Sequence, residues 1–301
     1  MHVPYSESRM SDQQIHPFLL DHLVEPRSHR PLSIDDHALV AEGGERYEIF
    51  SGIPIMLDAD TRNQQYVEHY QTDAEVFDYF EEREDPATAH DERRLQEAIL
   101  RRLDPRARTV LDVGCGRAWV ARTLCPRGVT VCSVDVSLTN PKRALENYPL
   151  PTHCALVADA FALPFADGSI DTIIASEIIE HVPDPRAFVH ELMRVIKPGG
   201  SLILSTPYKE KIKFCLCIHC NRRTPLHAHI HSFDENVLKG LTPTGSDVIC
   251  TWESFGNKVL LFLRTYPFLQ WMPHWLWRGV DSLANAVVNK RSHIVVQWQR
   301  R

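Results

Sequence analysis

The chain has 301 residues, of which 44% are apolar and 24% charged, as is usual for a soluble globular protein with one large domain, alone or with appendages. The net charge of −6 argues against a nucleic-acid partner, because neutralising phosphates requires a basic surface. We find no apolar signal sequence and no run of about eighteen apolar residues, and eight cysteines in so long a chain do not indicate a disulfide scaffold. We therefore expect a cytoplasmic protein.

The first 60 residues alternate short apolar runs with turn residues, which predicts a helix and a small β-hairpin unit. The segment resembles a zinc-ribbon-like module, but Glu25-Pro-Arg-Ser28 stands where the first cysteine pair would be, and Ala41–Arg46 contains no cysteine. The resemblance therefore implies a ribbon shape without its metal. The module would act as a platform for a partner or substrate, or would simply cover one edge of the main domain.

Two helices are predicted next, over residues 61–83 and 91–103. The first carries an aromatic stripe that includes Tyr66 and Tyr70, for which helical core packing is the simplest explanation. The second places its leucines and an isoleucine on one face.

The segment Thr109–Ala121 reads as a buried parallel strand, a glycine turn and the start of a helix. Its turn is Gly114-Cys115-Gly116, preceded by Asp112 at the end of the strand. Glycine suits such a turn because it lacks a Cβ and permits close approach of a ligand. Trp119 replaces the third glycine of a dinucleotide fingerprint, which argues against a nicotinamide-dependent dehydrogenase.

Four further strands follow, alternating with helices. Three of them end near Asp135, Asp159 and Glu177, and the fourth follows the Lys197-Pro-Gly-Gly200 turn. This alternation predicts a doubly wound α/β domain that binds its ligand at the carboxyl ends of the strands.

The motifs LDVGCG, VDVS, ADAFALPFADGSIDTIIASEIIEHV and VIKPGGSLILSTP, in this order and spacing, resemble a class I S-adenosylmethionine-dependent methyltransferase. The branch most similar to them contains the ubiquinone and menaquinone methyltransferases. The resemblance covers roughly residues 109–207 and implies a Rossmann-like seven-stranded sheet whose last strand is antiparallel. The expected domains are the ribbon-like module at 1–60 and the methyltransferase domain at 61–301.

The resemblance also implies residue roles in binding S-adenosylmethionine. Gly114 and Gly116 would lie against its methionine part, with Asp112 fixing the turn or reaching the ammonium group. Asp135 would hold the ribose hydroxyls, and Asp159 would accept the adenine amino proton beside Ala160. Glu177 would lie below the sulfonium. The cofactor set is completed by two neighbours of these residues, Cys115 and Val136. In such enzymes the helix before the domain closes over the cofactor, so Tyr66 or Tyr70 could contact its methionine end.

Methyl transfer needs an acceptor atom aligned with the breaking C–S bond, and an oxygen acceptor must also lose its proton. His181 is the first candidate for a general base because imidazole titrates near neutral pH, and Glu180 is the second. Local packing remains the alternative explanation for His181.

Residues 207–235 hold a cluster of cysteines and histidines. Cys217 and Cys220 have the spacing of a zinc knuckle, and His229 and His231 would lie on one side of an extended segment. Two sulfurs and two nitrogens would form a closed, structural zinc site, with Cys215 and His227 as spare ligands. A metal-free loop of reduced thiols is the alternative.

A strand is expected at 246–254 and the last one at 293–298, with a tryptophan-rich helical insertion at 256–291 between them. We expect the insertion to form a lid above the active site or a buried subdomain. Contact with a membrane surface is the alternative, since indole favours the headgroup region.

The sequence thus predicts methyl transfer to a small-molecule, sugar or lipid-linked acceptor. The alternatives are a non-catalytic cofactor-binding partner protein and an RNA methyltransferase, the latter disfavoured by the acidic charge.

Overall fold

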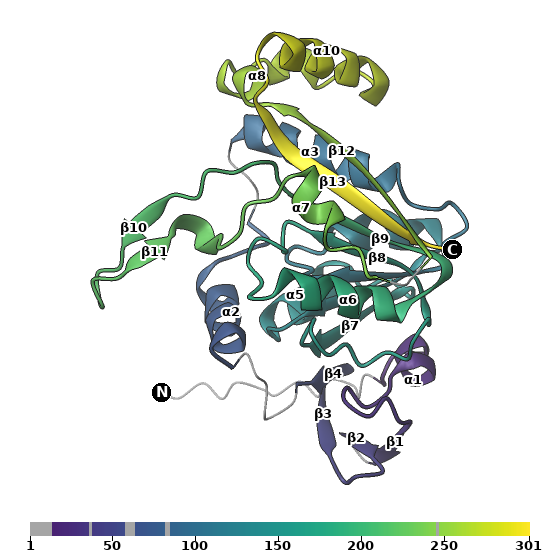
Figure 1. Cartoon of the computed structure of the whole chain (residues 1–301). Coiled ribbons are helices and arrows are strands. Elements are labelled where there is room, and N and C mark those ends of the chain that lie inside the picture. Colours follow the sequence, from purple (N-terminus) through teal and green to yellow (C-terminus); the bar gives the residue numbers. More distant parts are fainter. Residues whose placement is uncertain (1–13, 36–37, 58–63, 82–84, 245–246) are drawn as a thin grey trace, which may run out of the picture.

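The computed structural model describes residues 14–35, 38–57, 64–81, 85–244 and 247–301. Its main feature is an 11-stranded sheet with the order β1-β2-β3-β4-β7-β6-β5-β8-β9-β13-β12 (Figure 1). Helices cover both faces of its central part, as expected for a doubly wound domain.

Seven strands, from β7 to β12 in this order, are those of the predicted domain. The strands that correspond to the sequence motifs are β5 (Thr109–Val113), β6 (Thr130–Asp135), β7 (His153–Ala158), β8 (Ile170–Ser176) and β9 (Ile196–Pro207). They pair in parallel, whereas β13 (Arg291–Arg300) is antiparallel to both β9 and β12 (Val248–Asn257). The Rossmann-like sheet with an antiparallel last strand is therefore confirmed. Residue 246, where the sixth strand was expected to begin, lies outside the described residues.

Each face of the sheet has its own apolar core. On one face α6 (Pro185–Val195) buries Phe188 and Leu192, and the helix begins at Asp184, whose side chain accepts bonds from two backbone N–H groups. On the other face α3 (Pro86–Leu100) packs Leu95 and Ile99 together with α4 (Trp119–Leu124). The remaining helix between central strands is α5 (Thr139–Asn147), and α7 (Glu235–Lys239) precedes β12.

The N-terminal module continues the main sheet. After α1 (Pro17–His22), the strands β1 (Leu32–Asp35), β2 (Ala38–Ala41), β3 (Arg46–Phe50) and β4 (Ile53–Met56) form antiparallel hairpins. Strand β4 then pairs in parallel with β7. The module thereby covers what would otherwise be an exposed sheet edge. Residues 1–13 and 58–60 of the expected module lie outside the described residues.

Glu25, in the first position of the missing cysteine pair, is buried and bonded. Its carboxylate accepts hydrogen bonds from the backbone N–H groups of Arg27 and Ser28 and from the Tyr47 hydroxyl. Burial alone would raise its pKa, but these bonds outweigh that effect and hold the pKa at about 2. A charged, hydrogen-bonded carboxylate therefore stabilises the turn at which a zinc ribbon would bind its metal.

Two segments lie beyond the carboxyl ends of the central strands: α2 (Gln64–Val76) and the hairpin formed by β10 (Phe214–Leu216) and β11 (Arg223–Pro225). Figure 1 shows both on the same side of the sheet, with the hairpin projecting away from the body of the molecule. A short 3₁₀ turn, Leu226–Ala228, follows β11 and leads the chain back towards the sheet.

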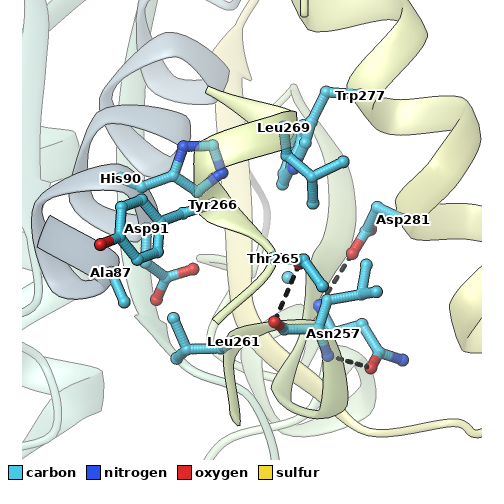
Figure 2. A pocket seen from close by; sticks show the side chains of 12 residues that line it. Ala87, His90, Asp91, Asn257, Leu261, Thr265, Tyr266, Leu269, Trp277 and Asp281 are labelled. Atoms are coloured by element: carbon cyan, nitrogen blue, oxygen red, sulfur yellow. Dashed lines mark hydrogen bonds between the residues drawn. The ribbon is translucent and has the colours of Figure 1, made fainter. Parts of the chain in front are cut away.

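The insertion before β13 contains α8 (Lys258–Phe262), α9 (Tyr266–Leu269) and α10 (His274–Val287). It is attached to α3 through Arg94, a side chain only 1% exposed, which donates to the carbonyls of Leu269 and Met272. The guanidinium also lies 5.0 Å from the ring centre of Trp277. Between α3 and the insertion a hollow of about 20 Å³ remains (Figure 2), which is room for about one water molecule.

Candidate functional site

A cavity of about 510 Å³ lies at the carboxyl ends of β5, β6 and β8. This is where an open α/β sheet binds its ligands, and the volume suits a small organic molecule. Its floor comes from the strand ends, and its walls come from α2 and from the segment Thr224–Ala228, which begins in β11 and continues into the 3₁₀ turn. The cavity therefore combines motif residues with two segments that no motif marks.

The glycine turn after β5 forms part of the floor. Gly114 has a φ of +70°, and a Cβ placed on it would lie 2.3 Å from Cδ1 of Ile178, so a side chain here would strain the backbone and displace Ile178. Its backbone N–H donates to the carbonyl of Val134, which ties the turn to β6. Gly116, with a φ of +45°, lines the cavity as well.

Asp135 ends β6 and faces the cavity together with Val136. Its carboxylate accepts bonds from the Ser137 backbone N–H, at 3.0 Å, and from Nδ2 of Asn140, at 3.2 Å. Burial raises the pKa of Asp135, while these bonds act in the opposite direction. The side chain is thus held in place at the point where two neighbouring hydroxyl groups of a ligand could donate to it.

Three of the expected cofactor residues lie behind the cavity wall. Asp112 is 2% exposed, Cys115 is equally buried, and neither lines the cavity. Burial and the charge of Asp135 raise the pKa of Asp112 well above its usual value. The Asp159 carboxylate bonds back to the Phe161 N–H, while Ala158 and Ala160 on either side of it do line the cavity.

Glu177 occupies a strained position at the end of β8. Its φ of 55° is uncommon for a residue with a side chain, and such strain concentrates at functional sites. The carboxylate lines the cavity, and its Oε1 is buried without a hydrogen-bond partner. Burial raises the pKa of Glu177, although His293, 3.9 Å away and itself bonded to Asp91, acts against this shift.

His181 and Glu180 follow in the turn after β8. His181 lines the cavity, and burial, helped by the neighbouring His229, lowers its pKa to about 4, so the ring is neutral at physiological pH. Glu180 lies behind it at 1% exposure, and its Oε2 accepts a bond from Thr206 Oγ1 at 2.9 Å. Burial and the charge of Glu177 raise the pKa of Glu180 well above its ordinary value.

The opposite wall is aromatic. Tyr66 and Tyr70 of α2 pack edge to face, with ring centres 4.8 Å apart, and Tyr70 also contacts the ring of His181. The aromatic stripe of the sequence includes both tyrosines, but no motif points to Tyr79, His69, Asp73 or Asn140 in the wall. A hydrogen bond between Tyr79 and Asp73 holds two of these residues in place. Within the described residues, the tryptophan-rich insertion does not line the cavity, so the structure gives no direct support to a lid above the site.

In the described part of the chain, the four side chains expected to bind zinc do not form one cluster, so the structure gives no support to that site. Cys217 lies in the turn of the β10–β11 hairpin, and the backbone N–H groups of Cys220 and His219 lower its pKa, as in a knuckle. His231, however, bonds through Nε2 to the carbonyl of Val182, 3.0 Å away. His229 lies beside Glu180 and His181, with ligand atoms of all three within 4.8 Å of one another.

Residues 111–204 match the family model described as "Methyltransferase domain". The chain is 42% identical over 103 residues to a 2-methyl-6-phytyl-1,4-hydroquinone methyltransferase of Synechocystis sp., an alignment that covers 34% of this chain and 32% of that protein. It is 32% identical over 126 residues to a ubiquinone biosynthesis O-methyltransferase of Xanthomonas axonopodis pv. citri, which covers 40% and 52% of the two chains. The chain thus spans between a third and about half of the length of these curated relatives.

Solved structures match over a larger part of the chain. An S-adenosylmethionine-dependent methyltransferase from Mesorhizobium loti superposes with a TM-score of 0.50 and 17% identity, over 70% of this chain and 100% of that one. A protein from Pyrococcus horikoshii gives a TM-score of 0.51 and 17% identity, over 78% and 99% of the chains. At such identity these matches show the fold alone. Residues 111–204 of this chain thus match a methyltransferase domain, and the solved structures show that a larger part of the chain has the same fold.

Proposed function

We propose that the whole protein transfers a methyl group from S-adenosylmethionine to a small-molecule acceptor bound in the 510 Å³ cavity. The observation that carries the proposal is the continuity of that cavity. The glycine turn and Asp135 open into the same space as Glu177, His181 and the aromatic wall of α2.

The donor set fits the cofactor. The backbone at Gly114 and Gly116 is accessible because neither residue has a side chain, and Asp135 would accept bonds from the ribose hydroxyls. The adenine would lie towards Ala160, which lines the cavity directly after Asp159. The unpartnered Oε1 of Glu177 offers negative charge to the cationic sulfonium.

S-adenosylmethionine supplies a methyl group bonded to positively charged sulfur. The protein's main contribution is to hold the acceptor atom in line with the C–S bond, and positioning of this kind is worth roughly 7–11 kcal/mol in favourable intramolecular reactions. Tyr70 and His181 form the side of the cavity where the acceptor would lie. An oxygen acceptor must also lose a proton, for which the neutral ring of His181 is the first candidate and the buried Glu180 the second.

The acceptor that suits this wall is an aromatic, lipid-linked small molecule. Tyr66, Tyr70, Phe77 and Tyr79 present ring faces and edges on which another ring can stack. One relative is named a methyltransferase of a phytyl hydroquinone and another an O-methyltransferase of ubiquinone biosynthesis, which supports the same class. Sugar acceptors would instead favour a wall of hydrogen-bonding side chains.

The test is to incubate the protein with isotopically labelled S-adenosylmethionine and, in parallel, prenylated hydroquinones, prenylated catechols and simple sugars. We expect labelled product from the prenylated aromatic compounds and none from the sugars. Cofactor binding without any labelled product across a wider acceptor panel would favour the alternative of a non-catalytic cofactor-binding protein.

A second proposal concerns the insertion, which we propose to rest on an anionic membrane surface. Four of its aromatic side chains are almost fully exposed: Phe262 (84%), Phe268 (80%), Trp271 (84%) and Trp275 (71%). Exposed apolar patches of this kind mark interaction surfaces. Residues 256–291 contain five lysines and arginines but a single acidic residue, in a chain whose net charge is −6. Aromatic and basic side chains together favour an anionic bilayer surface.

Flotation with phosphatidylglycerol vesicles tests this contact. Trp271→Ala/Trp275→Ala should lose most of the vesicle binding, whereas Trp252→Ala, a partly exposed tryptophan on β12, should keep it. Equal binding by both variants would contradict the assignment. None of the helices in the described residues is long and apolar enough to cross a membrane.

A further inference from the structure

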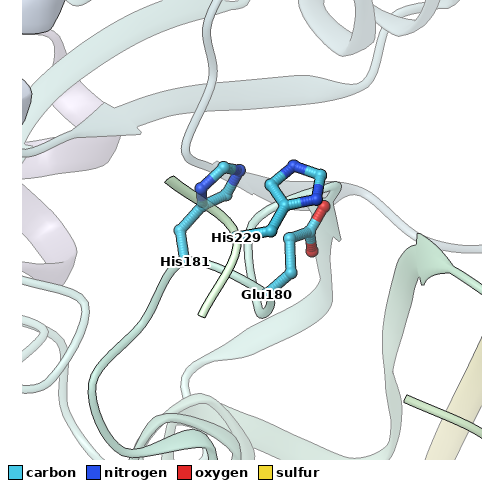
Figure 3. Close-up of side chains that lie close together, drawn as sticks. All are labelled: Glu180, His181 and His229. Atoms are coloured by element: carbon cyan, nitrogen blue, oxygen red, sulfur yellow. The ribbon is translucent and has the colours of Figure 1, made fainter. Parts of the chain in front are cut away.

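Three side chains with metal-binding atoms meet at one corner of the cavity. Glu180 and His181 come from the turn after β8, and His229 comes from the extended segment that returns from the β10–β11 hairpin. Figure 3 shows the three side chains grouped together, and their ligand atoms all lie within 4.8 Å of one another.

The backbone fixes this meeting of two distant segments. The N–H groups of Ile230 and His231 both donate to the carbonyl of Glu180, at 2.9 and 3.2 Å. The ring of His231 is bonded to the carbonyl of Val182. The segment that carries His229 is therefore attached to the turn that carries the other two residues, both at Glu180 and at Val182.

Two further side chains orient two of the three residues. Nδ1 of His229 is bonded to Glu210 at 2.5 Å, which leaves Nε2 as its free ring atom. One carboxylate oxygen of Glu180 accepts a bond from Thr206. Metal-bound histidines commonly donate their other N–H to a carboxylate in this way, and the partner fixes the ring and strengthens the ligand.

An unpartnered atom points independently to a missing ligand. Nδ1 of His181 is buried and has no hydrogen-bond partner. A buried polar atom left unsatisfied costs free energy, and a bound ion or water at this nitrogen would remove that cost. The ring of His181 also lines the cavity, so whatever binds at this nitrogen would be next to the acceptor.

We propose that Glu180, His181 and His229 bind one divalent transition-metal ion of the Zn²⁺ class in the wall of the cavity. Two imidazoles and one carboxylate form the donor set of sites that keep a coordination position open for a substrate or water. Such a site differs from the closed Cys₂His₂ arrangement expected from the sequence, because it uses neither Cys217 nor Cys220.

The ion would act on the acceptor, a consequence that rests on the proposed methyl transfer. When an acceptor hydroxyl binds the ion, the pKa of the hydroxyl falls and its proton passes to solvent. The oxygen then forms the O–CH₃ bond as the C–S bond breaks, and the electron pair of that bond stays on sulfur. His181 would in this case serve as a ligand and not as the general base.

The first experiment measures bound zinc in the full-length protein after loading with ZnCl₂ and removal of the excess, with no cofactor or acceptor present. We expect one zinc ion per chain in the wild type, in His227→Asn and in Cys217→Ser/Cys220→Ser. His227 is the matched control, since it lines the same cavity but is not in the cluster. Zinc should be lost in His181→Ala and His229→Ala, and Glu210→Gln should bind it about 10–100-fold more weakly.

The opposite pattern would overturn the proposal: zinc lost in the cysteine variant and retained in His181→Ala, or no zinc in the wild type. If a variant fails to fold, the wild-type protein loaded with Co²⁺ still distinguishes the two possible metal sites. Its absorption spectrum should lack a thiolate-to-metal charge-transfer band, and the presence of that band would place the metal at the cysteines. Because none of these readouts requires turnover, a failure of the metal site and a failure of methyl transfer remain distinguishable.

Discussion

The two halves of the cavity are built in different ways. The half that we propose for the cofactor, the cofactor half, consists of strand ends and the turns that follow them, so Gly114 and Asp135 are held by the sheet itself. The acceptor half consists of α2, the turn after β8 and the segment after the β10–β11 hairpin, which meet only through tertiary contacts. A shared cofactor requires the first half to be constant, whereas the second half is free to differ with the acceptor. Changes in the two halves should therefore affect different binding constants.

The largest effect is expected from Gly114→Ala. An alanine at this φ costs roughly 1–2 kcal/mol, and the contact with Ile178 adds about 1–3 kcal/mol. We expect about 100-fold weaker binding of S-adenosylhomocysteine by calorimetry. Gly128→Ala is the matched control, because Gly128 has a φ of +79° with no atom within 4 Å of the added Cβ. Equal losses in the two variants would show that backbone strain alone, and not the site, accounts for the effect.

Asp135→Ala should have the next largest effect. Losing hydrogen bonds to a charged group costs about 1.5–3 kcal/mol, which corresponds to roughly 10–150-fold weaker cofactor binding. The same substitution at Asp104, outside the cavity, should leave the affinity unchanged. Unchanged cofactor affinity in Asp135→Ala would show that the ribose does not bind at this position.

Tyr70→Leu tests the acceptor half. The variant loses the ring contacts with Tyr66 and His181, so kcat/KM for the acceptor should fall about tenfold, while the affinity for S-adenosylhomocysteine should change less than twofold. Tyr266→Leu, in the insertion, should alter neither quantity. A large change in cofactor affinity in Tyr70→Leu would mean that the two halves are not separate.

The smallest effect concerns stability and its pH dependence. Burial lowers the pKa of His293, but Asp91 and Glu177 outweigh burial and raise it above 6.5. A raised histidine pKa adds stability that is fully present below pH 6.5 and disappears as the pH rises through the folded-state value. Asp91→Asn should therefore lose about 1 kcal/mol of unfolding free energy at pH 6 and less at pH 9. The control is the denaturation of Asp247→Asn, which removes an exposed ion pair with Arg301. If the stability lost in Asp91→Asn grew as the pH rose, the predicted direction of the pH dependence would be contradicted.

The cofactor half could be predicted because its signals are local. A buried strand followed by Gly114-Cys115-Gly116, or by an acid such as Asp135, marks the carboxyl edge of the sheet from sequence alone. The alternation of strands and helices likewise predicts the doubly wound sheet, and the resemblance to methyltransferases adds its antiparallel last strand. Even there, spacing could not show which neighbours line the cavity, and Asp112, Cys115 and Asp159 are not among its lining residues.

The acceptor half could not be predicted because its residues meet across long stretches of chain. His229 reaches Glu180 through backbone bonds between residues about fifty positions apart, and the cysteine–histidine spacing carries no sign of them. The place of the insertion could not be predicted from the sequence either. Its apolar residues fit a lid, a core or a membrane surface equally well until Arg94 shows which side of the sheet it covers.

The central claim is tested most directly by a crystal structure with bound S-adenosylhomocysteine. We predict ribose hydroxyls at Asp135, the adenine towards Ala160, and the sulfur facing Glu177 and His181. A ligand bound elsewhere, or a cavity that stays empty at saturating S-adenosylhomocysteine, would contradict the assignment of this cavity as a methyl-transfer site.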